Sequence, residues 1–320
     1  PLVAVLFGFG LSLGGLDAPA CVCAGVTALC SIWWITEAIP IPATALIPFA
    51  VFPLAGIVSH KVIAHSYGHS LILLMLTGAI IGTALEKSGA HRRVALGMVR
   101  LVGGYGGRRL VLGFLLASAV LSMWISNTAT VVMLFPVALA VLESTEEKDG
   151  LTIPLLLAVA YGAAVGGSAT PVGTPANVIM MEAYASKTGI EMSFLDWMKT
   201  GMPVVVLMLP AVWLWLTRRF PRNETKRMVL PELGPWTPEQ RRVLIVFACT
   251  AMAWFTRGAP FGGWSKLIGA TGFAGDSTVA LVAAIALFII PDGKQDGGKL
   301  LDWKTASGVP WGVFIMIGGG

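Results

Sequence analysis

Long apolar runs, interrupted by short polar loops, dominate the chain. Uncharged apolar stretches occupy residues 2–16, 204–216 and 279–290. A helix that crosses a bilayer needs roughly 20 mostly apolar residues, and stretches of this kind form the greater part of such helices. The pattern therefore predicts an all-α polytopic membrane protein, whose first transmembrane helix covers residues 1–18.

The composition of the chain supports this interpretation. Of its 320 residues, 56% are hydrophobic and 12% are charged, and the mean hydropathy is +0.79. These values exclude a soluble enzyme, a secreted disulfide scaffold and a disordered chain. The four cysteines all lie in apolar segments, where we expect small hydrophobic side chains rather than disulfides or metal ligands. Because the sequence begins without a methionine and stops inside an apolar run, we expect a fragment.

The 22 lysines and arginines are unevenly distributed among the loops. Six lie within residues 87–109, seven within 218–242 and three within 294–304. Cytoplasmic loops hold an excess of these residues, so we place these three loops on the inside. The net charge of +5 follows from this topology and requires no nucleic-acid partner.

The apolar segment 110–143 must return to the side from which it enters. Arg109 is placed inside and Lys187 outside, so an odd number of crossings separates them, and residues 151–186 supply one. The two halves of 110–143 hold about 16 and 14 residues, or roughly 24 and 21 Å, which is short of a ~30 Å hydrocarbon core. We therefore expect a re-entrant helical hairpin, with a polar tip near mid-membrane that marks a binding site. The tip residues are Ser126, Asn127 and Thr128.

The next segment, residues 151–186, is too long for one regular helix across a bilayer. Its middle, Gly166 to Pro175, contains three glycines, two prolines and three hydroxyl side chains. These residues disfavour a helix, so we expect an unwound stretch between two half-helices. Thr174 and Pro175 suit the N-cap and first-turn positions of the second half. A broken helix facing a re-entrant hairpin is typical of a transporter site.

The predicted site can hold two opposite charges without a charged side chain. Ser122 and Ser126, expected on one helical face, and the carbonyl groups at the helix end and in the unwound stretch offer oxygen to a cation. The N–H groups that begin the second hairpin helix and the helix after Pro175 favour an anion. Neither apolar stretch has an acid or histidine near its middle, which disfavours a proton relay. The expected substrate-binding residues are Ser126, Asn127, Thr128, Thr170, Gly173, Thr174 and Pro175.

Two weak internal similarities indicate a repeated structure. Residues 71–80 resemble 311–320, and residues 45–56 resemble 280–293 at nearly the same offset. In secondary transporters such repeats often have inverted topology. The predicted organisation is a first repeat at 19–220 that includes a helix at 202–217, a cytoplasmic linker at 221–240, and a truncated second repeat at 241–320.

Four motifs carry a resemblance to a known family. They are Trp-Trp-Ile-Thr-Glu-Ala-Ile-Pro-Ile-Pro at residues 33–42, Trp-Ile-Ser-Asn-Thr-Ala-Thr at 124–130, Gly-Gly-Ser-Ala-Thr-Pro-Val-Gly-Thr-Pro-Ala-Asn at 166–177, and Val-Pro-Trp-Gly at 309–312. With these motifs the chain resembles the divalent anion/sodium symporters, which include sodium-dependent dicarboxylate, citrate and sulfate carriers.

The resemblance implies a function, partners and individual roles. It implies a secondary transporter that carries succinate-like di- and tricarboxylates by sodium-coupled symport, with Na⁺ as the coupling ion and no other cofactor. The transporter would be a homodimer in membrane lipid that works by an elevator-type movement. It would have no enzyme activity. Asn127 and Thr128 would contact substrate, and a second half-site would lie beyond Gly320. The implied sodium ligands are Ser122, Ser126, Asn127 and the backbone of Gly167. We expect the protein in the bacterial inner membrane.

Several alternatives stay open at this point. A sodium-independent dicarboxylate exchanger, or a sulfate, arsenite, citrate-metal or sodium/proton carrier, would have a related build. The polar tip could serve only interhelical hydrogen bonding, and residues 166–175 could form an external loop. An intramembrane hydrolase lacks a base near Ser126, and a structural subunit would need no broken helix. The histidines at 60, 65 and 69 are expected in a solvated loop rather than at a metal.

Overall fold

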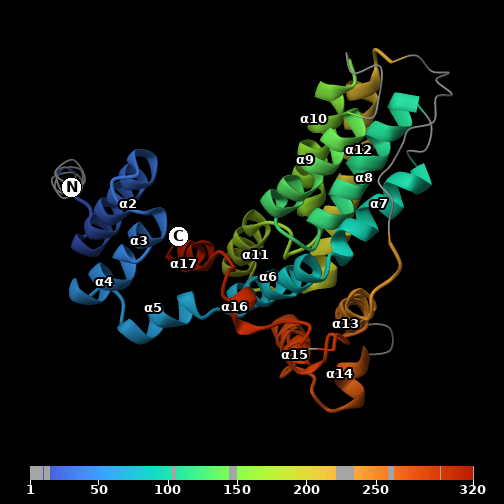
Figure 1. Cartoon of the computed structure of the whole chain (residues 1–320). Coiled ribbons are helices and arrows are strands. Elements are labelled where there is room, and N and C mark those ends of the chain that lie inside the picture. The colour runs from blue at the N-terminus through green and yellow to red at the C-terminus, as the bar shows by residue number, and fades with distance from the viewer. Residues whose placement is uncertain are drawn as a thin grey trace. The chain divides into compact units, whose positions relative to one another are not determined.

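The computed structural model describes residue 10 and residues 15–102, 106–143, 150–220, 234–258, 263–295 and 297–319. Within these ranges every regular element is a helix, and the only β-type pairing is an isolated bridge between Pro291 and Lys299. The all-α prediction is therefore confirmed (Figure 1). The helix predicted at residues 1–18 falls largely outside the described residues, and the helix α2 begins at Ala18.

The chain divides into two compact units, the first formed by Pro1–Leu76 with Pro310–Gly320. Its helices are α2 (Ala18–Thr36), α3 (Ile41–Thr44), α4 (Ile47–Leu54), α5 (His60–Tyr67), the start of α6 (Ser70–Ser88), and α17 (Trp311–Gly319). The Tyr67 hydroxyl donates to the carbonyl of Ala45 at 2.5 Å. The loop expected at residues 60–69 is mostly helical, because the Ser59 side chain caps α5 by accepting from the amide of Val62.

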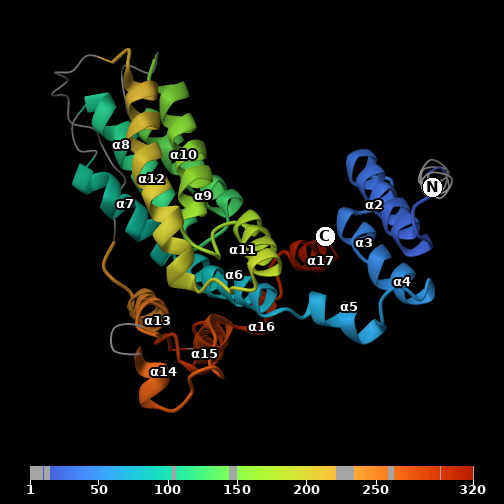
Figure 2. The same cartoon turned by 180° about the vertical axis from the view of Figure 1, so that it is seen from behind.

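The second unit, Thr77–Val309, contains the remaining helices. Figures 1 and 2 show α8, α9, α10 and α12 lying alongside one another as a bundle, with α7 against α8. The helices are α7 (Ala90–Val102), α8 (Gly106–Ser122), α9 (Asn127–Glu143), α10 (Thr152–Gly166), the 3₁₀ turn η1 (Gly167–Ala169), α11 (Pro175–Thr188), α12 (Phe194–Thr217), α13 (Pro238–Phe255), α14 (Gly263–Leu267), α15 (Asp276–Ile289) and α16 (Trp303–Ala306).

Two predicted boundaries are wrong. The helix expected at 202–217 begins at Phe194, because Ser193 and Asp196 form a capping box that starts α12 eight residues earlier. The predicted linker 221–240 is too long at its end, because Thr237 and Gln240 form a second capping box and α13 begins at Pro238. Residues 221–233 of that linker lie outside the described residues.

Four described helical stretches are long and apolar enough to cross a membrane by length and composition. They are Ala18–Thr36, His60–Ser88, Thr152–Ala169 and Phe194–Thr217. Along α12, large apolar side chains such as Leu207 and Trp215 are exposed, as suits contact with lipid. Helix α8 differs, since 12 of its 17 residues are buried. At 1.5 Å per residue it is about 26 Å long, so it is a short helix enclosed by protein.

Close contact between α8 and α10 depends on glycine. A Cβ added to Gly162 would lie 2.5 Å from the carbonyl oxygen of Leu115, and one added to Gly166 would collide with the backbone of Ala119. Only residues without a side chain allow the two backbones to approach this closely, which is a common way for membrane helices to pack.

Replacing Gly166 by alanine is expected to destabilise the protein. The new methyl group meets backbone atoms that cannot rotate away, so we expect the free energy of unfolding to fall by about 1–3 kcal/mol. Gly97→Ala on α7 is the matched control, because nothing lies within 4 Å of a Cβ at that position. That change should be neutral or stabilising by up to about 1 kcal/mol. Denaturant titration in detergent micelles measures both, and equal stabilities of the two variants would contradict the packing account.

Candidate functional site

The turn of the helical hairpin contains the first part of the site. Helix α8 ends at Ser122 and α9 begins at Asn127. The Ser126 hydroxyl accepts a hydrogen bond from the amide of Ala129 at 3.2 Å, so Ser126 caps α9. Ser122 and Ser126 do not share one helical face, because α8 ends before the second serine.

The interruption between α10 and α11 contains the second part. Helix α10 ends at Gly166, η1 follows, and Thr170 is already extended, with φ −128° and ψ 155°. Pro171 and Pro175 have no N–H to donate, and Pro175 is the first residue of α11. Thr174 occupies the N-cap position in extended conformation, but its side chain makes no capping hydrogen bond.

The hairpin turn and the helix interruption meet, and oxygen atoms gather where they do. The Ser122 hydroxyl donates to Asn127 Oδ1 at 2.5 Å. A Cβ added to Gly173 would lie 2.8 Å from the carbonyl oxygen of Ser122 and would collide with the carbonyl oxygen of Gly167. A Cβ added to Gly167 would collide with Asn127 Oδ1. We call these groups, the carbonyls of Ser122 and Gly167 with the side chains of Ser122 and Asn127, the oxygen cluster.

Four helix ends surround the oxygen cluster. Helices α8 and α10 present their C-termini there, and α9 and α11 present their N-termini. C-terminal carbonyls carry partial negative charge and N-terminal amides partial positive charge. The cluster therefore offers uncharged oxygens of the kind that hard cations take, next to amides that favour an anion. Among the described residues there is no group of three His, Cys, Asp or Glu side chains that could hold a metal ion.

The predicted site residues differ in their exposure. Ser122, Gly167 and Gly173 are buried, Asn127, Thr174 and Pro175 are partly buried, and Ser126 and Thr128 are exposed. Ser122, Asn127 and Gly167 come together in the oxygen cluster, and their role as sodium ligands stays a prediction. The Ser126 hydroxyl is engaged in capping α9 instead.

Thr170 does not fit the role of a substrate contact in this structure. The residue is fully buried, and its hydroxyl donates to the carbonyl of Met123 in the hairpin turn. Its side chain therefore ties the interrupted helix to the hairpin rather than facing a ligand. Which atom the Thr170 hydroxyl bonds to depends on how two segments 47 residues apart pack together, and the sequence pattern does not reveal that packing.

Sequence reasoning also missed Asn177. It is 5% exposed, and its side-chain amide donates to the carbonyls of Gly167 at 2.8 Å and Thr170 at 2.7 Å. Asn177 is the last residue of the motif at 166–177, and its place in that motif was the sequence signal that could have identified it as part of the site.

Aromatic side chains support the site from one side. Trp124 of the hairpin turn stacks 6.1 Å from Phe194 at the start of α12, and Phe194 stacks 4.3 Å from Trp254 near the end of α13. Trp197, in the first turn of α12, donates from Nε1 to the carbonyl of Ser168 in η1 at 3.0 Å. Both parts of the site are thus held against α12.

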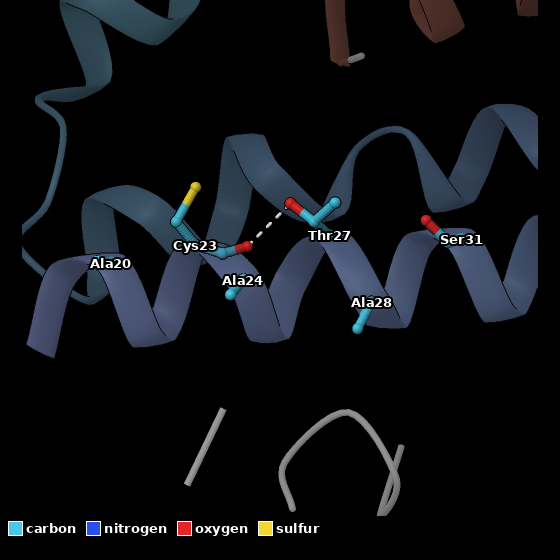
Figure 3. Close-up of a pocket in the computed structure, with 6 residues that line it drawn as sticks. All are labelled: Ala20, Cys23, Ala24, Thr27, Ala28 and Ser31. Atoms are coloured by element: carbon cyan, nitrogen blue, oxygen red, sulfur yellow. Dashed lines mark hydrogen bonds between the residues drawn. The ribbon is translucent and has the colours of Figure 1, made fainter. Parts of the chain in front are cut away.

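A separate hollow lies on one face of α2 in the first unit (Figure 3). It carries no charged side chain, and the Thr27 hydroxyl is bonded to the carbonyl of Cys23 at 2.9 Å. Such a face suits helix packing and offers little to an anionic ligand. Its lining residues are Ala20, Cys23, Ala24, Thr27, Ala28 and Ser31.

Comparison with known proteins identifies the family of the chain. A family model described as citrate transporter matches residues 31–320. The chain belongs to this family. It is 36% identical over 315 residues to the sodium-dependent dicarboxylate transporter SdcS of Staphylococcus saprophyticus, and 34% identical over 315 residues to the protein of the same name from Staphylococcus aureus strain USA300.

The alignments cover 92% of this chain but 60% of each relative. The chain therefore spans about 60% of the length of these curated relatives. The resemblance to anion/sodium symporters is confirmed at the level of the family, and family membership together with the apolar helices identifies a multi-pass membrane protein. The relatives are named as transporters, not as enzymes.

Proposed function

We propose that this chain forms one half-site of a sodium-coupled carrier of succinate-like di- and tricarboxylates in the bacterial inner membrane. The observation that carries the proposal is the meeting of the hairpin turn with the interrupted helix. It places the oxygen cluster beside the N-termini of α9 and α11. A cation and a carboxylate can then be bound next to each other, so that each lowers the electrostatic cost of binding the other.

The roles of individual residues follow from this proposal. Sodium would be held by Ser122, Asn127 and the Gly167 carbonyl. A substrate carboxylate would meet the Asn127 and Thr128 side chains at the start of α9, and the backbone at Gly173, Thr174 and Pro175 at the start of α11. Ser126 would contribute through its backbone, since its hydroxyl caps α9.

Polar contacts between loops support the proposed orientation in the membrane. Three segments placed inside lie together, since Lys87 Nζ is 2.7 Å from Asp302 and Arg93 donates to the carbonyl of Pro235 at 2.8 Å. The Lys87 ammonium and the amide and hydroxyl of Thr305 lower the pKa of Asp302, which favours the charged carboxylate beside Lys87.

The segment that follows Lys187, which was placed outside, lies beside the segment that joins α13 to α15. Arg257 Nε is 2.8 Å from Asp276, which accepts from the amide of Phe194 at 2.7 Å. Helices α8 and α9 would then form a re-entrant hairpin, with both outer ends inside. A short helix with an irregular turn is tolerated at membrane depth where protein surrounds it, and the burial of α8 meets this condition.

The larger assembly belongs to the same proposal. We infer that the protein acts as a homodimer surrounded by lipid, by an elevator-type movement, with a second half-site from an inverted repeat and without enzyme activity. The names of the relatives support sodium as the coupling ion and dicarboxylates as substrates.

Uptake of radiolabelled succinate by the full-length protein in proteoliposomes tests the function. An inward sodium gradient is expected to accelerate uptake at least about tenfold over a choline gradient of equal strength, because binding of sodium and anion is coupled by about 1.4 kcal/mol or more. Unlabelled succinate and citrate serve as competitors. Uptake that is the same in sodium and choline would indicate an exchanger and contradict the proposal.

A further inference from the structure

The interruption between α10 and α11 places several backbone carbonyls outside the regular α-helical hydrogen-bond pattern in a buried region. Gly167, Ala169, Thr170 and Gly173 are all buried. A buried carbonyl that lacks a partner is costly, and more so where water is scarce. The Asn177 side chain donates to two of these carbonyls, those of Gly167 and Thr170, and the Thr170 carbonyl also accepts from the Gly173 amide at 3.3 Å.

Asn177 is well placed for this task. It is the third residue of α11, its own amide N–H donates to the Thr174 carbonyl at 3.1 Å, and its side chain reaches back across the interruption. A side-chain amide has two hydrogens, and here each goes to a different carbonyl. A serine at this position could supply one such bond, and an alanine none.

The two carbonyls held by Asn177 belong to residues that touch the hairpin. The Thr170 hydroxyl donates to the carbonyl of Met123, and Gly167 lies against Asn127 Oδ1. The Gly167 carbonyl is itself part of the oxygen cluster. A carbonyl oxygen has two lone pairs, so Gly167 can accept from Asn177 and still present the other lone pair to a cation.

We propose that Asn177 is a positioning residue of the sodium site, which fixes the Gly167 carbonyl at the distance from Ser122 and Asn127 that sodium requires. This inference rests on the proposed function. Asn177 touches neither ion nor substrate in this account. It acts by preventing the Gly167 and Thr170 carbonyls from turning toward other partners when the ion leaves.

The experiment measures sodium binding through its stabilising effect on the full-length protein. Thermal unfolding of wild type, Asn177→Ser and Asn177→Ala is followed as sodium replaces choline at constant ionic strength, without substrate. A ligand that binds only the folded state stabilises it by an amount set by the ratio of ligand concentration to the dissociation constant. The titration therefore gives the sodium concentration at which binding to the folded protein is half-maximal. We expect this concentration to rise about threefold in Asn177→Ser and about tenfold in Asn177→Ala, one lost hydrogen bond at a time.

Ser118→Ala is the matched control. Ser118 is fully buried, and its hydroxyl donates to the carbonyl of Val159 at 2.6 Å, so it links α8 to α10 away from the oxygen cluster. Its loss should lower the unfolding temperature in choline without changing the half-maximal sodium concentration. A purely structural role for Asn177 would produce this same pattern in the Asn177 variants and would overturn the inference.

The two proposals fail in different ways. A wild type that sodium does not stabilise would overturn the proposed function together with this inference. A sodium-stabilised wild type whose half-maximal concentration is unchanged in Asn177→Ser would overturn the inference alone. Asn177→Ser retains one donor, so it provides the decisive comparison where Asn177→Ala does not fold.

Discussion

Replacing Asn127 by alanine is expected to abolish sodium-dependent succinate uptake. The side chain stands at the first residue of α9, where its Oδ1 accepts from the Ser122 hydroxyl and lies against Gly167. In our account Asn127 supplies an oxygen to sodium and an amide hydrogen to the substrate carboxylate. Hydrogen bonds to charged groups contribute about 1.5–3 kcal/mol each, so losing both contacts should reduce uptake at least about 100-fold.

Ser186→Ala is a suitable control for this prediction. Ser186 is exposed near the end of α11, and its hydroxyl donates only to the carbonyl of Ala183, at 3.0 Å. Initial rates of uptake into proteoliposomes, corrected for the amount of reconstituted protein, should be unchanged by this substitution. An Asn127→Ala protein that retains half of the wild-type rate would contradict the assignment of the site.

Gly173→Ala is expected to weaken sodium binding by filling the oxygen cluster. The added methyl group would lie 2.8 Å from the Ser122 carbonyl oxygen and would collide with that of Gly167. Both are backbone atoms, so the two segments must move apart, and overpacking of this kind costs about 1–3 kcal/mol. The same displacement should raise the half-maximal sodium concentration at least about tenfold, since a shift of 1.4 kcal/mol already has this effect.

The neighbouring Val172→Ala provides the comparison. Val172 packs on the side of α6, where a Cβ added to Gly78 would lie 2.8 Å from its Cγ1. Truncation of this side chain removes apolar contact and lowers stability, but leaves the carbonyls in place. Sodium titrations that shift equally in the two variants would mean that general loosening, and not the filled space, explains the effect of Gly173→Ala.

The main outline of the site could be predicted because it depends on local chemistry and on length. The glycines and prolines of residues 166–175 disfavour a helix wherever they occur, and α10 ends and α11 begins within this stretch. The hairpin could be predicted because each half of residues 110–143 is too short to cross the membrane. An odd number of crossings must also separate Arg109, placed inside, from Lys187, placed outside. The start of α12 was missed because Asp196 and Lys199 make its first turns polar, although Ser193 and Asp196 form a recognisable capping box.

Contacts between the two segments could not be predicted in the same way. Whether the Thr170 hydroxyl faces a ligand or the Met123 carbonyl is decided by how the hairpin turn packs on the interrupted helix. The role of Ser126 as the cap of α9 also depends on where α8 ends. The two carbonyl partners of Asn177 likewise become visible only in three dimensions. The inverted repeat, the dimer and the elevator movement stay predictions.

Sodium flux driven by substrate tests the central claim most directly. Full-length protein is reconstituted into vesicles with equal sodium on both sides, and uptake of radiolabelled sodium is followed after an inward succinate gradient is applied, with the membrane potential clamped. Symport predicts sodium accumulation that follows the succinate gradient and disappears in Asn127→Ala. Succinate entry without any accompanying movement of sodium would contradict sodium coupling and the assignment of the oxygen cluster to a cation.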